Sequence, residues 1–346
     1  MTSHLANRRD ILGLALAATL AAPLLAAGKK GTAALLIPLT GASASIGLAL
    51  QRAVALAPQD AKAEAIMAFD TGGTPEGAAT AARQAVKRGA RIILGPLFSA
   101  ETADVIAAVG GGFPVLSFSN DESLIGGGAF LLGVTATQSV SALLGYARRR
   151  GVRRVVAYGG TSLWSRQGLA AAQRSKAALG IELSELPAPL PAGQTLLAAL
   201  KQLGKGDLPD AVLVTDGAAD LIAAARALDG SGVQLLASEP ATDAAAISGA
   251  WAAGSDPSTM VEFAKRYQER FGALPGSLAA LAFDGSALIR SLQAGGTVDR
   301  AALSSASANG ITGPIRFRAD GGAQRELAIL VAGERGYSVV DKSQTA

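Results

Sequence analysis

The chain has 346 residues, of which 49% are hydrophobic, 4% aromatic and 17% charged, and its formal net charge is +4. This length suggests two domains of about 150 residues, the apolar content excludes disorder, and the mild charge does not imply nucleic-acid binding. Cysteine is absent and the one histidine is His4, which excludes disulfides and, after loss of the N-terminus, histidine triads and ordinary zinc sites, so we expect neither an enzyme nor a cofactor.

The first 28 residues have the pattern of an export signal. Arg8 and Arg9 precede an uncharged run from Ile11 to Leu25, and small residues follow it. A basic start, a short apolar stretch and small residues are typical of a secretory signal, and the paired arginines resemble the twin-arginine type. The run is shorter than the roughly 20 residues needed to span a bilayer, although a retained anchor is the alternative. We predict cleavage near Ala27 or Gly28 and a periplasmic location.

Strands and helices then alternate along the chain. Thr74, Pro75 and Glu76 form a helix start with a capping hydroxyl, a first-turn proline and an acid near the positive helix end. The sequence predicts strands at 33–38, 64–69, 91–94 and 114–116, with helices at 45–57, 74–88 and 99–109 between them.

The same alternation continues to residue 237 and then changes. Predicted helices at 139–150, 165–179, 196–203 and 218–228 alternate with strands at 153–158, 181–186, 211–215 and 234–237. Two helices, 259–271 and 278–292, precede short strands near 315–317, 327–332 and 337–340. Such alternation is typical of βαβ units, and there are too many units for one sheet. We therefore predict the α/β class, with two Rossmann-like lobes that each contain a parallel sheet.

Polar residues follow the predicted strands, where parallel sheets bind ligands. The candidates are Ser99, Ser117, Ser119, Asn120 and Asp121 in the first lobe, and Trp164, Asp216, Ser238 and Glu239 in the second. Four of these candidates have a structural alternative: Ser99 as a helix cap, Asp121 as a cap or turn former, Trp164 as a core residue, and Glu239 as an exposed hinge charge. Five arginines between 148 and 154 surround Gly151; we interpret them as a helix end rather than a nucleic-acid patch, and expect no nucleic-acid partner.

The order of several segments resembles the leucine/isoleucine/valine-binding protein family, which has the type I periplasmic binding fold. These segments are 36–41, 69–71, 93–96 with Ser99, 114–117, and the closing run 310–317 followed by Asp320-Gly321. The resemblance implies two lobes joined by three crossovers that close on a ligand. We assign residues 29–136 and about 250–312 to the first lobe, and 137–249 and about 313–346 to the second.

The resemblance also implies roles for the candidate residues. Ser99 and the loop from Ser117 to Asp121, which includes Ser119, would hold an α-carboxylate, Glu239 an α-amine, and Trp164 would cover the ligand. The family often has a tyrosine where this chain has Asp216, which leaves the amino-acid pocket incomplete. The ligand-binding residues expected on this basis are Ser99, Ser117, Ser119, Asp121, Trp164, Asp216 and Glu239.

Two functions are compatible with this fold. The first is a solute-binding protein that delivers a small, amino-acid-like ligand to an ABC permease in the inner membrane. The second is suggested by the closing segment and the composition, which also resemble penicillin-binding protein activators; the partner would then be a penicillin-binding protein. The chain lacks the cysteine that tethers the lipoprotein members of that group.

Overall fold

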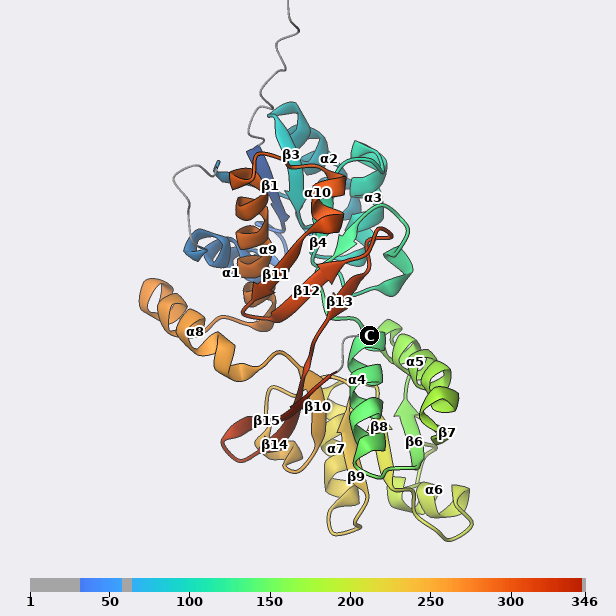
Figure 1. Ribbon diagram of the computed structural model, residues 1–346. Helices are drawn as coiled ribbons and strands as arrows, with labels where there is room; N and C mark the ends of the chain where they lie inside the picture. The colour runs from blue at the N-terminus through green and yellow to red at the C-terminus, as the bar shows by residue number, and fades with distance from the viewer. Residues whose placement is uncertain (1–31, 58–63, 344–346) are drawn as a thin grey trace, which may run out of the picture.

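The computed structural model describes residues 32–57 and 64–343, and these form two α/β lobes, one above the other (Figure 1). The expected export signal, residues 1–28, lies outside the described residues. Within the described ranges, no helix combines the length and the apolar character needed to cross a membrane.

The first lobe is built on a parallel five-stranded sheet with the order β2-β1-β3-β4-β5. Its strand β1, which pairs with β2 on one side and β3 on the other, has five consecutive buried residues, because helices cover both faces of the sheet. The strands are β1 (Thr32–Ile37), β2 (Ile66–Asp70), β3 (Ala90–Leu94), β4 (Val115–Ser117) and β5 (Phe130–Leu131), and the helices between them are α1 (Ala44–Leu56), α2 (Pro75–Lys87) and α3 (Ser99–Val109).

Local signals fix several of these elements. The Thr74 hydroxyl accepts a hydrogen bond of 3.1 Å from the Gly77 N–H, and Pro75 opens α2, as the sequence predicts. The start of α1 packs so closely on the turn after β1 that a Cβ on Gly47 would lie 1.7 Å from the Pro38 carbonyl oxygen. Only glycine permits this approach.

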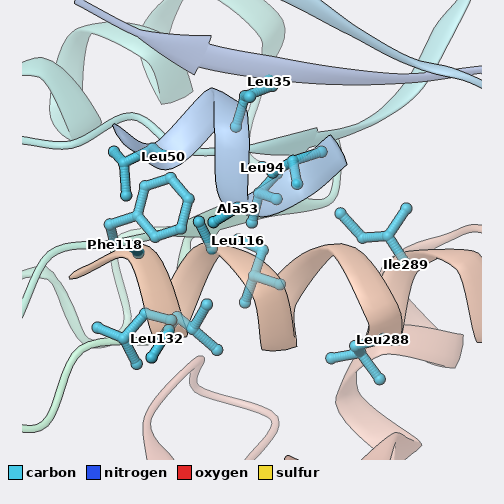
Figure 2. Packing of buried hydrophobic residues seen from close by; sticks show 14 of the residues in the cluster. Leu35, Leu50, Ala53, Leu94, Leu116, Phe118, Leu132, Leu288 and Ile289 are labelled. Atoms are coloured by element: carbon cyan, nitrogen blue, oxygen red, sulfur yellow. The ribbon is translucent and has the colours of Figure 1, made fainter. Parts of the chain in front are cut away.

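Late segments of the chain complete the first lobe. These are α9 (Ser277–Ala294), α10 (Arg300–Ser305) and an antiparallel sheet of β11 (Ser307–Gly310), β12 (Gly313–Phe317) and β13 (Ala323–Arg325). Leu288 and Ile289 of α9 belong to the same buried cluster as the leucines of β1, β3 and β4, part of which Figure 2 shows. Phe317 of β12 packs edge-on against Phe130 at 5.5 Å. Residues 313–325, which we assigned to the second lobe, therefore share the core of the first.

The second lobe has a seven-stranded sheet with the order β15-β14-β10-β9-β8-β6-β7. The neighbours from β10 to β7 pair in parallel, whereas β14 and β15 add an antiparallel hairpin. The strands are β6 (Arg154–Gly159), β7 (Glu182–Pro187), β8 (Ala211–Val214), β9 (Gln234–Ala237), β10 (Trp251–Gly254), β14 (Ala328–Gly333) and β15 (Gly336–Lys342), with helices α4 (Ala136–Arg149), α5 (Leu163–Leu179), α6 (Leu196–Leu203) and α7 (Ala218–Leu228).

The chain passes between the lobes at three places. The first crossover, residues 132–135, joins β5 to α4; the second, residues 255–256, joins β10 to α8 (Pro257–Phe271); the third, residues 326–327, joins β13 to β14. In Figure 1 the third crossover runs down the middle of the molecule, and α8 lies beside the junction of the lobes. The strand β10 belongs to the second sheet, so the second crossover lies slightly later than the expected boundary near residue 250.

Candidate functional site

A cavity of about 690 Å³ lies between the lobes. Both lobes and the first two crossovers contribute to its walls. Its polar lining residues are Ser99, Ser119, Asn120, Asp121, Ser139, Ser238, Glu239, Ser255, Ser277, Thr312 and Tyr337, and its larger apolar ones are Leu97, Phe98, Phe118, Val134, Leu163, Trp164, Pro240, Pro257, Met260, Leu278, Leu281 and Leu330. No lysine, arginine or histidine is among the described residues that line it.

The start of α3 contributes Phe98 and Ser99 to the first-lobe wall. Glu101 receives a 3.0 Å hydrogen bond from the Phe98 N–H and so closes the first turn of this helix. The half-buried Ser99 is the first residue of α3, and its hydroxyl makes no hydrogen bond to the described part of the chain. A helix start has free N–H groups and a positive dipole end, so this corner suits a ligand carboxylate.

The last residue of β4 and the loop that follows it contain polar side chains, some of which line the cavity while others do not. Ser117 is fully buried, lies 2.9 Å from the Thr102 hydroxyl and does not line the cavity, so its place is structural. Ser119 lines the cavity and accepts a 3.1 Å bond from the Asp121 N–H. Asp121 also lines it, while its Oδ1 accepts bonds from the N–H and hydroxyl of Ser123, as in the turn interpretation.

Trp164 forms part of the second-lobe wall. It is half-buried at the start of α5, and its Nε1–H donates a 3.0 Å hydrogen bond to the Ser238 hydroxyl. The Ser139 hydroxyl donates to the Ser238 carbonyl oxygen, which fixes Ser238 from the other side. The indole N–H is therefore satisfied within the protein, and the ring itself is the surface that Trp164 presents to the cavity.

Glu239 is the one acid of the cavity wall that has no partner in the described residues. Water reaches its side chain, yet the cleft walls around it desolvate the carboxyl group and raise its pKa above the usual value of 4.5. Because no cation lines the cavity, nothing in its described wall neutralises this carboxylate.

Asp216 lies apart from the other candidates. Its Oδ1 accepts a 3.2 Å hydrogen bond from the Ser162 hydroxyl, and it is not among the residues that line the cavity. The structure thus brings Ser99, Ser119, Asp121, Trp164 and Glu239 to one cavity and leaves Ser117 and Asp216 outside it.

Thr312 and Tyr337 are cavity residues that the sequence reasoning did not select. Thr312 lies between β11 and β12, and the Tyr337 hydroxyl donates a 3.0 Å bond to the Ala241 carbonyl oxygen. Neither residue follows a parallel strand, so the expectation that ligands bind at the carboxyl ends of parallel strands could not identify them. Thr312 does lie in the closing run 310–317 that supports the family resemblance. Its place in this run was the one sequence signal that could have pointed to it as a cavity residue.

Known structures have the same architecture. A leucine-binding protein from Thermotoga maritima has a TM-score of 0.64 at 19% identity, over 91% of this chain and 99% of that one. A branched-chain amino acid ABC transporter periplasmic ligand-binding protein from Burkholderia xenovorans has a TM-score of 0.74 at 16% identity, over 90% and 95%. A solute-binding protein of an ABC transporter from Rhodopseudomonas palustris, in complex with 3,4-dihydroxybenzoic acid, has 0.65 at 20%, over 91% and 96%.

One comparison of the sequence, with a family model, agrees with this fold. A search of the curated proteins finds no matching sequence. The comparisons give no support to a penicillin-binding protein as partner. The family model described as periplasmic binding protein matches residues 32–336, and the expected resemblance to the leucine-binding group is confirmed. The chain therefore belongs to the periplasmic binding protein family and has its type I fold.

Proposed function

We propose that this protein is an exported solute-binding protein that delivers a zwitterionic, amino-acid-like ligand with an apolar side chain to an ABC importer. The observation that carries this proposal is the unpaired Glu239 carboxylate in a cavity whose described wall contains no basic side chain. A ligand ammonium group would neutralise it. The family to which the chain belongs supports solute binding, and the export signal predicted for residues 1–28 supports export.

The opposite wall favours a carboxylate on the same ligand. Ser99 and the first turn of α3 offer a free hydroxyl and N–H groups, and Ser119 and Asn120 lie in the same wall. Hydrogen bonds from such neutral donors bind a carboxylate without a basic side chain. The acid and these donors come from different lobes, so an amino acid could connect the two.

Apolar side chains make up much of the remaining lining, among them Phe118, Met260, Leu278 and Leu281. A cavity of about 690 Å³ is within the range of small-molecule sites and leaves room for a bulky side chain. The Trp164 ring would cover such a ligand. The matched proteins from Rhodopseudomonas palustris were crystallised with benzoate and 3,4-dihydroxybenzoic acid; an aromatic acid in this cleft would leave Glu239 unpaired, which disfavours that class here.

Binding in such a protein needs no chemical step. An open state and a closed state exchange by hinge motion, and a ligand that touches both lobes only in the closed state shifts the population toward closure. The closed form is then the one that an importer would recognise.

Thermal-shift measurements on the mature protein test this proposal. The panel contains leucine, phenylalanine, their amides, and benzoate. We expect the zwitterions to raise the melting temperature, because a ligand at 100 times its Kd stabilises the folded state by about 2.7 kcal/mol. Stabilisation by benzoate but by no amino acid would overturn the assignment of ligand class, and no stabilisation by any small solute would overturn the transport function.

A further inference from the structure

Arg325 is a buried cation at the junction of the lobes. It ends β13, immediately before the third crossover, and its side chain is only 4% exposed. Its Nη2 donates to the carbonyl oxygen of Leu132, the first residue of the first crossover, and its Nη1 donates a 3.3 Å bond to the Thr312 hydroxyl. One side chain therefore connects two of the three crossovers and a residue of the cleft.

Thr312 brings the second crossover into the same network. The Ser255 hydroxyl, from that crossover, donates a 3.2 Å bond to the Thr312 carbonyl oxygen. On its other side, Thr312 donates from its N–H and its hydroxyl to Oδ2 of Asp284 on α9, at 2.8 Å and 2.5 Å. Thr312 also lines the cleft, so the network meets the binding cavity at this residue.

The buried charge of Arg325 opposes separation of the segments that this network joins. Burial lowers the pKa of Arg325 to about 10, with the nearby Asp284 carboxylate acting in the opposite direction, so Arg325 stays protonated at neutral pH. Its Nε has no hydrogen-bond partner in the described part of the chain, and the cation depends on the bonds at Leu132 and Thr312. A buried cation that lost either bond would be left further uncompensated, which opposes separation of these segments.

We propose that Arg325 is a positioning residue that, through Thr312, holds the three crossovers together at the floor of the cleft and thereby restricts the relative orientation of the two lobes. Lobe closure then occurs as rotation about this fixed point, while the outer edges of the cleft move. The inference builds on the two-lobed binding cleft of the proposed function, but it concerns the ligand-free protein and can fail separately from it.

The distribution of distances between the lobes tests this role without any ligand. The sequence has no native cysteine, so Glu76→Cys on α2 and Lys176→Cys on α5 place one spin label on each lobe. Pulsed electron paramagnetic resonance then measures the width of the distance distribution. We expect Arg325→Met to broaden it clearly and Arg325→Lys, which keeps the charge, to restore part of the narrow distribution.

A matched control separates this role from general destabilisation. Arg300 donates to the Gly128 carbonyl oxygen and lies over the Phe130 ring, all within the first lobe; Arg300→Met should leave the distribution unchanged. If Arg325→Met does not fold, Thr312→Val removes the shared hydroxyl and should broaden the distribution by itself. A folded Arg325→Met or Thr312→Val protein with the wild-type distribution would overturn the proposal.

Discussion

Gln167 on α5 donates a 2.9 Å hydrogen bond from its Nε2 to Oδ1 of Asp121, and this bond joins the second lobe to the first beside the cleft. A second contact lies near it, because Glu122 accepts bonds from the N–H and hydroxyl of Thr137 at the start of α4. Arg174 of α5 donates a 2.8 Å bond to the same Thr137 hydroxyl. Polar contacts therefore connect the lobes on this side of the cleft.

Removal of the Gln167 bond should loosen the lobes slightly. A hydrogen bond of this kind contributes about 0.5–1.5 kcal/mol, so Gln167→Ala should shift the ligand-free protein toward more open forms without unfolding it. Small-angle scattering should report a larger radius of gyration. The control is Gln173→Ala, since Gln173 is on the same helix but bonds to Glu185 within its own lobe. Equal scattering from both variants would show that the Asp121 contact does not restrain the lobes.

Loss of the Glu239 charge should weaken binding of an amino-acid ligand. Glu239→Ala leaves the ligand ammonium unpaired in the cleft and should cost about 2–5 kcal/mol, or roughly 30-fold or more in affinity. Calorimetry with the best ligand from the panel measures this change. Glu182→Gln, at an exposed position at the start of β7, should bind as the wild type does. An unchanged affinity in Glu239→Ala would remove Glu239 from the site.

Binding should also depend on pH through Glu239. Its pKa in the folded protein is raised above 4.5 by desolvation, so it takes up a proton at a higher pH than the unfolded chain does. Its contribution to the free energy of unfolding therefore becomes more favourable as the pH falls through this raised pKa. Affinity for an ammonium ligand should fall over the same interval, because the neutral acid offers no charge.

Calorimetry in two buffers of different ionisation enthalpy can detect the proton that ligand binding releases from Glu239. The pKa of Glu101 is raised as well, by burial next to the start of α3. Glu239→Gln distinguishes the two acids: it should abolish the release if Glu239 is the source. Release that persists in this variant would indicate Glu101.

Trp164 should report ligand binding through its fluorescence. The chain has two tryptophans, and the other, Trp251, packs edge-on against Tyr146 at 4.8 Å and does not line the cavity. A ligand that covers the indole of Trp164 should change its emission. Trp251→Phe should keep this ligand-induced change and Trp164→Phe should abolish it. The reverse result would place the ligand away from Trp164.

Gly47→Ala should destabilise the first lobe strongly. The added Cβ would lie 1.7 Å from the Pro38 carbonyl oxygen, so α1 must move away from the turn after β1. We expect a loss of about 1–3 kcal/mol or more in the free energy of unfolding, measured by chemical denaturation. Gly145→Ala on α4 is the control, because the nearest atom to its Cβ is Nη1 of Arg149 at 3.8 Å. This second change should stabilise the protein, since alanine favours a helix by about 1 kcal/mol over glycine.

The sequence alone determined the class of fold and much of the cleft. Apolar runs such as 33–38 indicate strands covered on both faces, and cap residues such as Thr74 mark helix starts, because these signals depend on local backbone chemistry. The carboxyl ends of the strands then led to Ser99, Ser119 and Glu239, which line the cavity. The resemblance carried by the order of segments pointed to the family.

Only the tertiary structure decided the rest. Ser117 and Asp216 also lie at or just after the ends of strands, yet their side chains bond to Thr102 and Ser162 and lie outside the cavity. The strands at 313–325 are short and antiparallel, and their apolar pattern shows which face is buried but not which lobe covers it. For the same reason the network of Arg325, Thr312 and Asp284 had no signal in the sequence, because it joins residues that packing, rather than spacing along the chain, brings together.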